Sequence, residues 1–532
     1  MKMKIMMFVD IYWLLVLFST ASFSNGNYFD RGGNFSHHQS SVNQFYGCET
    51  SAYPPDERDC VPTRLIDLTL EPRLRWRELV LEKKSELVEL VGHVYNLTEL
   101  LLGESALHFL LHNLGKVISS LPLTYQQELE GIADAAGLEL EQITFYNIFY
   151  EIFSFCTSIV IQDKHGQLYH GRNLDFGLFL GWNNATHQWR VTELLRPLVV
   201  QLEWHNTTSL VYTSVSYVGY IGIVTANKPD AFSFSVNERF SWDGGYVGLI
   251  EWIVFGDHKQ QWLTTLTRDV LLMAGTYDEA VQQLATPRLL APVYFTLAGT
   301  RPGQGCIITR YRDDYQLLNL GSADYHADWY LVQTNYDHWK TPPFYDDRRT
   351  PAFTCLDRGV NMSASGVERG PRLPQARTAD IPRSIKNLEA PGHGDFDNTE
   401  TRTSKNDLSK SGLADVTADT QVTGCGILNY IIDKKRELQD VISSYWYAGL
   451  RKARRLLGIK ENDQQPAMKK SSPKATLETV YDDNQEPLSL LYNVLSTRPV
   501  LNKLTTYTTL MSAKQGYIKT WVRQCPDPCW PW

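Results

Sequence analysis

The spacing of apolar residues predicts a helical region over about 72–155. Leu79, Val80, Leu87, Leu90 and Val91 recur at intervals of three, four and seven residues, the period of one helix face. The same period continues through "ALHFLLHNLGKVISSLP" and "TYQQELEGIADAAG". Most apolar stripes of this kind form core, so we expect these helices to pack on the rest of the chain. A surface that faces substrate or lipid is the alternative.

After Cys156 the pattern changes to short apolar or alternating runs bounded by turn residues, which is typical of strands. The predicted strands are "TSIVIQD", "QLYHGRNLDF", "RPLVVQLEW", "SLVYTSVSY", "AFSFSVNERFS", "PVYFTLAG", "GCIITRYR" and "WYLVQTNYD". A helix at "YDEAVQQLAT" lies among them, and strand-like character resumes at "LLYNVLSTRPVLNKLTTYTTL". Leading helices followed by antiparallel sheets predict the α+β fold class.

The composition shifts over 358–486, where Ser, Thr, Asp, Lys and Arg dominate and aromatic residues are few. We therefore expect an insertion that is largely disordered. Within it, "ILNYIIDKKRELQDVISSYWYAGLRKARRLLGIK" predicts an amphipathic basic helix. Such a helix either contacts an anionic membrane or docks on the protein core, and the sequence leaves both open.

The first residues, 1–24, predict a secretory signal peptide, so the mature chain is expected to begin near Asn25. Its apolar stretch, from Ile11 to Phe18, is shorter than the roughly 20 residues that a spanning helix needs. We find no later segment in the sequence that is long enough to span a membrane, so we expect a lumenal or secreted protein.

Composition agrees with that route. The 532 residues are 43% hydrophobic and 12% aromatic, which is typical of a globular chain, and the net charge of -8 disfavours a nucleic-acid partner. Five N-x-S/T triplets are candidate glycosylation sites, at Asn34, Asn96, Asn184, Asn206 and Asn361. We find no cluster of His, Cys and carboxylates with metal-ligand spacing, and we expect no cofactor.

Eight cysteines in an oxidising compartment should be mostly paired, yet one catalytic thiol would leave seven. Cys525 and Cys529 in "CPDPC" are close enough for a small bridge, and Cys48 lies in a loop-like segment suited to a long-range one. Spacing alone does not fix the connectivity.

The chemistry centres on "FCTSIVIQDKHGQLYHGRNLDFG", which predicts a hairpin with its turn at "DKHG". Pairing Asp163 with Gly166 places Cys156 opposite about Asn173, and brings Arg172 and Asp175 close to the thiol. An arginine beside a thiol favours the thiolate, and a carboxylate can hold an ammonium group.

A thiol nucleophile also needs a proton acceptor, and neither His165 nor His170 is obviously placed for that task. Cleavage between Phe155 and Cys156 would supply one, because the freed α-amine of Cys156 has an ordinary pKa of about 8. The alternative is a structural cysteine buried in a strand.

Four longer motifs carry a family resemblance: "NIFYEIFSFCTSIVIQDKHGQLYHGRNLDFGLFLGW", "VNERFSWDGGYVGLIEWI", "VQTNYDHWKTPPFYDDRRTPA" and the C-terminal run that ends "CPDPCWPW". Together they resemble the acid ceramidases, which are N-terminal-nucleophile hydrolases like the N-acylethanolamine acid amidases and bile-salt hydrolases. The resemblance covers about 48–532 except 358–486. It implies an αββα sandwich, with a helical α subunit over 25–155 and a β subunit built from 156–357 and 487–532.

The resemblance implies a role for each site residue. Cys156 would cleave the bond after Phe155 and then attack the substrate amide through its thiol. Arg172 would tune that nucleophile, and Asp175 would engage the new amino terminus. Asn335 resembles the oxyanion-hole asparagine, whose removal typically costs about 100-fold or more in rate.

Two further residues and two disulfides follow from the same resemblance. Arg348 resembles a second catalytic arginine, and Glu238 resembles a polar residue of the active site. Cys48 would pair with Cys355 and link the two pieces, and Cys525 would pair with Cys529. The partners of Cys60, Cys306 and Cys425 stay open.

The implied activity is hydrolysis of the N-acyl bond of ceramide to sphingosine and fatty acid, in the lysosome with some secretion. The implied partners are a saposin-type activator and an anionic lysosomal membrane surface. Two alternatives stay open: an amidase of N-acylethanolamines or related fatty acyl amides, and an inactive lipid-binding protein. The insertion at 358–486 departs from the family pattern; it is either a surface loop, which costs little entropy, or an error in how the sequence was assembled.

Overall fold

The structure, a computed structural model, describes residues 47–102, 104–149, 154–176, 181–207, 209–239, 260–343, 346–361 and 487–529. All of these belong to one compact unit. The predicted signal peptide, the basic helix of the insertion, Asn34 and Cys425 lie outside the described residues.

The helical region predicted from apolar spacing is confirmed. It consists of α2 (Arg77–Glu82), α3 (Lys84–Leu102), α4 (Glu104–Ser120), α5 (Leu123–Ala136) and α6 (Leu140–Phe149). Leu87, Leu90 and Val91 of α3 are buried, because their helical spacing turns them to the same side. The helix α5 ends where Gly137 takes a left-handed conformation, φ 70°, and its N–H donates to the carbonyl of Ala133.

The strands form two larger sheets. The first has eight strands, ordered β1 (Thr63–Asp67), β6 (Val199–Asn206), β7 (Ser209–Tyr217), β8 (Thr225–Lys228), β9 (Phe232–Glu238), β10 (Val293–Ala298), β11 (Gly305–Arg310) and β12 (Tyr315–Asn319). Neighbouring strands in this sheet are antiparallel except β1, which pairs parallel with β6 at one edge. The part of the chain before Cys156 therefore contributes a strand as well as helices.

The second sheet has five strands and contains Cys156. Its order is β13 (Tyr330–Gln333), β2 (Ser154–Gln162), β3 (Leu168–Phe176), β14 (Thr505–Ser512) and β15 (Tyr517–Val522), with antiparallel pairing throughout. A separate small ribbon joins β4 (Trp182–Asn183) to β5 (Gln188–Trp189). Residues from both sides of the 358–486 segment thus meet in one sheet.

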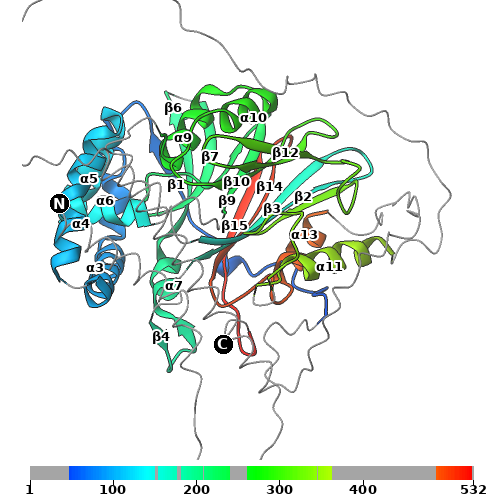
Figure 1. Cartoon of the computed structure of the whole chain (residues 1–532), viewed down its shortest axis with the longest axis horizontal. Coiled ribbons are helices and arrows are strands. Elements are labelled where there is room, and N and C mark those ends of the chain that lie inside the picture. Colours follow the sequence, from blue (N-terminus) through cyan, green and yellow to red (C-terminus); the bar gives the residue numbers. More distant parts are fainter. Residues whose placement is uncertain are drawn as a thin grey trace, which may run out of the picture. The chain divides into compact units, whose positions relative to one another are not determined.

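The two sheets stack face to face and helices cover the outer faces (Figure 1). The helices α9 (Leu263–Met273) and α10 (Tyr277–Ala285) pack on the eight-stranded sheet. The helices α11 (Arg349–Asn361) and α13 (Pro487–Ser496) pack on the five-stranded sheet, and α7 (Arg190–Leu195) packs against α3. This layering confirms the α+β prediction and matches the αββα order that the resemblance implied.

The strand-like prediction for 490–510 is wrong in its first part, because Pro487–Ser496 is the helix α13. Leu491 and Leu495, four residues apart, both point at Gly171 of β3, where an added Cβ would lie 3.4 Å and 2.9 Å from them. A continuous apolar run does not distinguish a buried helix from a buried strand. Tertiary packing on β3 makes it a helix here.

Candidate active site

The β2–β3 hairpin has a longer turn than its sequence suggested. The Asp163 N–H donates to the Gln167 carbonyl, so Asp163 pairs with Gln167 and not with Gly166. The turn holds three residues, ends on Gly166 with φ +78°, and is closed by Asp163 Oδ1, which accepts the N–H groups of His165 and Gln167. Cys156 is consequently opposite Leu174, and the predicted pairing with Asn173 is wrong by one residue.

That single residue decides which side chains share a face. Opposite residues of an antiparallel pair project to the same side, and successive residues alternate. Cys156, Leu174 and Arg172 therefore lie on one face, here called the thiol face, which is turned toward the eight-stranded sheet. Asp175, opposite Phe155, projects from the other face. The expectation that Asp175 lies beside the thiol through this hairpin is corrected: its carboxylate reaches the cysteine by way of Arg348.

Arg172 is the charged neighbour of the thiol. Its Nη2 donates to Cys156 Sγ at 2.8 Å, and its Nη1 donates at 2.6 Å to the carbonyl of Val224, which directly precedes β8 of the facing sheet. Both Arg172 and Cys156 are fully buried. A guanidinium held against sulfur in a site with little water favours the thiolate over the thiol.

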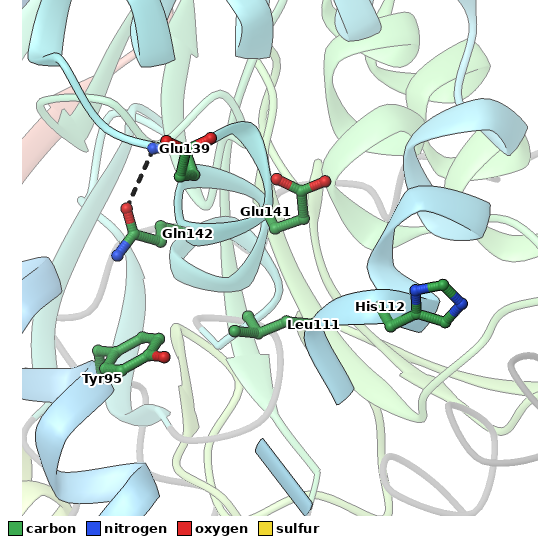
Figure 2. Close-up of a pocket in the computed structure, with 6 residues that line it drawn as sticks. All are labelled: Tyr95, Leu111, His112, Glu139, Glu141 and Gln142. Carbon is green, nitrogen blue, oxygen red and sulfur yellow. Dashed lines mark hydrogen bonds between the residues drawn. The ribbon is translucent and has the colours of Figure 1, made fainter. Parts of the chain in front are cut away.

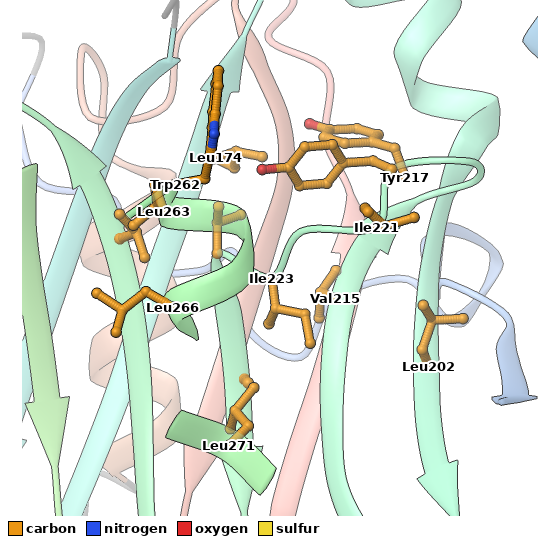
Figure 3. Close-up of a cluster of buried hydrophobic side chains, with 14 of the residues drawn as sticks. Leu174, Leu202, Val215, Tyr217, Ile221, Ile223, Trp262, Leu263, Leu266 and Leu271 are labelled. Carbon is orange, nitrogen blue, oxygen red and sulfur yellow. The ribbon is translucent and has the colours of Figure 1, made fainter. Parts of the chain in front are cut away.

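Cys156 and Leu174 of the thiol face belong to a large cluster of buried apolar side chains. Leu174 belongs to the same buried cluster as Cys156, together with Trp262, Leu263 and Leu266 at the start of α9. Figure 3 shows Leu174, Trp262, Leu263 and Leu266 together with Tyr217 and Ile223, which belong to the same cluster. Such a surrounding excludes water and strengthens the charge interaction at the sulfur.

The backbone of Cys156 is held by side chains because β13 ends early. Gln333, the last residue of β13, pairs with Ser158, and the same register continued by two residues places Asn335 opposite Cys156. There the Cys156 N–H donates to Asn335 Oδ1 at 2.7 Å, and the Cys156 carbonyl accepts from Arg348 Nη1 at 2.8 Å. Nucleophile, amide nitrogen and carbonyl are thus each held by a different residue.

Asn335 therefore lies at the site, and both its amide nitrogen and its amide oxygen form hydrogen bonds. Its Nδ2 donates to the backbone carbonyl of Glu238 at 2.8 Å, while Oδ1 accepts from Cys156 and Arg348. The role of Asn335 as an oxyanion-hole donor stays a prediction. Glu238 contributes its carbonyl to this contact, and its side chain is half-buried at the end of β9.

Arg348 lies between two carboxylates. Its Nη1 is 3.0 Å from Asp175 Oδ2, and its Nε and Nη2 are 2.6 Å and 2.9 Å from the two oxygens of Asp346. Asp175 also accepts from Asn502 Nδ2 and Thr505 Oγ1, at 2.9 Å and 2.7 Å. Burial raises the pKa of the Asp175 carboxyl and the pKa of the Asp346 carboxyl, and the positive charge of Arg348 opposes both shifts.

Neither nearby histidine is placed as the general base. His165 is exposed in the hairpin turn. His170 lies within hydrogen-bond reach of the hydroxyls of Ser233 and Ser235, 3.2 Å from Nδ1 and 2.9 Å from Nε2. Burial lowers the pKa of His170 to about 3, so this imidazole is neutral at any physiological pH. The proton acceptor for the thiol is still required, as the sequence indicated.

The sequence did not single out the residues that support the site from behind. Asn237 joins the two sheets: its Oδ1 accepts from Ser158 Oγ at 2.7 Å, and its Nδ2 donates to the carbonyls of Gln333 and Thr334. These carbonyls directly precede Asn335. The sequence signal for these residues was their position: Asn237 directly precedes Glu238, and Asp346 lies two residues before Arg348.

Two disulfides have the expected pairing. Cys48 is joined to Cys355 across 307 residues, and Cys525 to Cys529. Cys60, half-buried, and Cys306, buried, form no disulfide in the described part of the chain. Of the candidate glycosylation sites, Asn96, Asn184 and Asn206 are exposed, and Asn361 is the last residue of α11.

The described chain also has a pocket away from the thiol. A pocket of about 320 Å³ in the helical region is lined by six residues, none of them near Cys156 in sequence (Figure 2): Tyr95, Leu111, His112, Glu139, Glu141 and Gln142. Within the described residues, His, Cys, Asp and Glu side chains form no group of three that could hold a metal ion. None of the helices in the same part combines the length and apolar character needed to cross a membrane.

Known proteins resemble this chain over most of its length. Residues 156–363 match a family described as linear amide C-N hydrolases, choloylglycine hydrolase family. The acid ceramidase of Mus musculus is 34% identical over 490 residues, which is 91% of this chain and 93% of the mouse protein. The acid ceramidase of Heterocephalus glaber is 43% identical over 323 residues, 60% of this chain and 81% of that protein.

Among solved structures, the N-acylethanolamine-hydrolyzing acid amidase ortholog of Caenorhabditis elegans matches with a TM-score of 0.39 and 22% identity. The match covers 69% of this chain and 100% of that one. The mouse relative carries the conclusion, because identity of 34% over 91% of the chain goes far beyond a shared motif. The resemblance seen in the sequence is confirmed, and the chain belongs to the acid ceramidase family of linear amide C-N hydrolases.

Proposed function

We propose that this chain hydrolyses the N-acyl bond of ceramide to sphingosine and a fatty acid, after cleaving itself between Phe155 and Cys156. The observation that carries the proposal is the 2.8 Å contact between Arg172 Nη2 and Cys156 Sγ, because a buried thiol needs such a cation only if it acts as a thiolate. The names of the relatives supply the substrate.

Self-cleavage uses the three groups that hold Cys156. The thiolate adds to the carbonyl carbon of Phe155, the C–N bond between the two residues breaks, and the nitrogen takes up a proton to become a free amine. Water then hydrolyses the thioester on sulfur to the Phe155 carboxylate. Arg172 at the sulfur, Asn335 at the nitrogen and Arg348 at the carbonyl of Cys156 hold these atoms in place during the shift.

Turnover repeats this chemistry on the substrate. The new α-amine takes the thiol proton, the thiolate attacks the amide carbon of ceramide, and the amine returns its proton to the departing sphingosine nitrogen. Water then releases the fatty acid from the thioester. Asp175 is the carboxylate expected to engage the α-ammonium group. Arg348 lies next to both Asp175 and Cys156, with Nη1 at 3.0 Å from the Asp175 carboxylate and 2.8 Å from the Cys156 carbonyl oxygen.

The two pieces would stay together after cleavage. The disulfide between Cys48 and Cys355 spans the bond before Cys156, and β1 remains paired with β6. From the family resemblance we also expect the lysosome as the compartment, with some secretion, and a saposin-type activator and an anionic lysosomal membrane as partners.

The test is amino-terminal sequencing of the purified full chain after incubation at mildly acidic pH, beside Cys156→Ala and Cys306→Ala. Cys306 is a matched control, because it is also buried in a strand and burial raises the pKa of its thiol to about 12. We expect a fragment that begins Cys-Thr-Ser-Ile-Val from the wild type and from Cys306→Ala, and none from Cys156→Ala.

Turnover of ceramide and of an N-acylethanolamine by the same three samples distinguishes the alternatives. Faster turnover of the N-acylethanolamine would replace the substrate assignment. Lipid binding without turnover, with an uncut wild type, would establish the inactive binding protein and refute self-processing.

A further inference from the structure

Two adjacent aspartates in "DDRR" have different surroundings. Asp346 is 3% exposed, and its two oxygens accept from Nε and Nη2 of Arg348 at 2.6 Å and 2.9 Å. Asp347 is half-buried, and its Oδ1 accepts the N–H of Thr350 at 2.9 Å, in the first turn of α11. One aspartate serves the arginine of the site and the other caps a helix.

The guanidinium of Arg348 also contacts Cys156 and side chains around it, including the Thr157 hydroxyl at 3.4 Å from Nη1. Nη1 donates to the Cys156 carbonyl at 2.8 Å and to Asp175 Oδ2 at 3.0 Å, and Nη2 donates to Asn335 Oδ1 at 2.8 Å. Asp346 and Asp175 thus bind different nitrogens of one planar group. The position of Arg348 on Cys156 is set by the balance between these two carboxylates.

We propose that Asp346 is a positioning residue of this hydrolase: its carboxylate fixes the plane of Arg348 against the attraction of Asp175, so that Nη1 stays on the Cys156 carbonyl and Nη2 on the Asn335 oxygen. The inference deepens the proposed function and rests on it for the part of the test that reads turnover. A neutral residue at 346 would leave Asp175 as the stronger acceptor, and Arg348 would move toward it.

The charged groups around Asp346 and Asp175 allow the proposed role of Asp346 to be tested by varying the pH. Arg348 and Asp347 act on Asp346, and Arg348 and Asp346 act on Asp175, which also accepts from the neutral Asn502 and Thr505. Tyr336 is the further titratable group acting on Arg348. Because the Asp346 charge raises the pKa of Asp175, its removal should lower the pKa of that carboxyl, and the acid limb of the activity profile should move to lower pH.

A second readout needs no activity. Both carboxyls have a pKa above the ordinary 3.8, so the folded chain holds their protons more tightly than the unfolded chain. This contribution to stability is fully present below pH 3.8 and is lost as the pH rises through the folded pKa. Asp346→Asn removes one carboxyl and reduces the shift of the other, so the melting temperature should fall less steeply with pH above 3.8 than in the wild type.

The experiment compares the wild-type full chain with Asp346→Asn and with the matched control Asp347→Asn. We expect Asp346→Asn to lower kcat for ceramide in detergent micelles by about 10-fold to 100-fold with little change in KM, since displaced catalytic groups cost that much. The acid limb and the melting slope should change as stated. Asp347→Asn should leave kcat within about twofold, because an asparagine still caps the helix.

Other outcomes of this experiment would contradict the proposed role of Asp346. Wild-type kcat and an unmoved acid limb in Asp346→Asn, or equal losses in both variants, would overturn the inference. Should Asp346→Asn not fold, Asp346→Glu keeps the charge on a longer side chain: lowered kcat with an unmoved acid limb supports the inference, and wild-type kcat overturns it. A wild type without turnover defeats the proposed function, and the melting slopes then decide the inference alone, an unchanged slope overturning it.

Discussion

At the scale of single residues, Arg172 connects the nucleophile to the opposite sheet. One nitrogen of its planar guanidinium donates to Cys156 Sγ and another to the Val224 carbonyl. Lysine carries the same charge but lacks this fork, so it cannot hold both acceptors at a fixed geometry. The position therefore requires the shape of arginine as well as its charge.

We predict that Arg172→Lys lowers kcat/KM for ceramide by about 10-fold or more and that Arg172→Met lowers it by about 100-fold or more. The check is turnover together with the pH dependence of Cys156 alkylation, which should require higher pH in Arg172→Met. Arg310→Lys is the control, because Arg310 is also fully buried and donates to backbone carbonyls, of Leu284 and Pro287, away from the thiol. Equal losses in the control would mean that the variants report on folding.

At the scale of elements, the turn between β2 and β3 sets the chemistry of the hairpin. With a two-residue turn, Asp175 would share the face of Cys156 and Arg172 would lie on the opposite face. Because the turn has a third residue, Gly166, Arg172 shares the face of Cys156 and Asp175 lies on the opposite face. Gly166 takes φ +78°, and an added Cβ would lie 2.5 Å from Pro302 Cγ.

Gly303 provides a matched comparison for this glycine, since it has the same φ of +78° and nothing within 4 Å of an added Cβ. Gly303→Ala should cost about 1–2 kcal/mol of stability from backbone strain alone. Gly166→Ala should cost about 1 kcal/mol or more beyond that, because Pro302 must also move. Urea unfolding of both variants in a Cys156→Ala background measures the difference; equal costs would show that the Pro302 loop yields freely.

At the scale of the whole molecule, a buried ion-pair network joins the helical region to the sheets. Glu128 of α5 is 0% exposed and binds Arg268 of α9 at 2.5 Å and 3.0 Å. It also accepts from Arg75 Nη1 and Trp76 Nε1. The Arg268 guanidinium lies over Trp204, 4.6 Å from the ring centroid, so the network spans both sides of the proposed cleavage point.

Removing the carboxylate from this network should be costly, because it leaves a buried cation without its partner. We predict that Glu128→Gln destabilises the uncleaved Cys156→Ala chain by about 3–5 kcal/mol in urea unfolding. Glu130→Gln, on the same helix, is the control: its pair with Arg73 is exposed, so its loss should change the stability little. A small loss for Glu128→Gln would show that the arginines reach water or another acceptor.

Much of the architecture was determined by the sequence alone. Helical spacing in α3, apolar strand runs and the motifs around Cys156, Asn335 and Arg348 indicated the α+β class, the family and the residues that meet at the thiol. Periodicity determines the fold class because each element must bury one face, whereas the family and the site residues came from the resemblance of the motifs.

Tertiary structure decided those features that local sequence patterns do not distinguish. Leu491 and Leu495 lie in a helix that packs on β3, where Gly171 has no side chain and leaves room for both leucines. The one-residue register that separates Arg172 from Asp175 is set by how the turn closes. Asp346 and Asp347 are the same letter in the sequence, and only the buried position of Arg348 gives the first a role at the site. Such distinctions depend on which distant groups are within reach, and that is fixed only when the sheets and helices have packed.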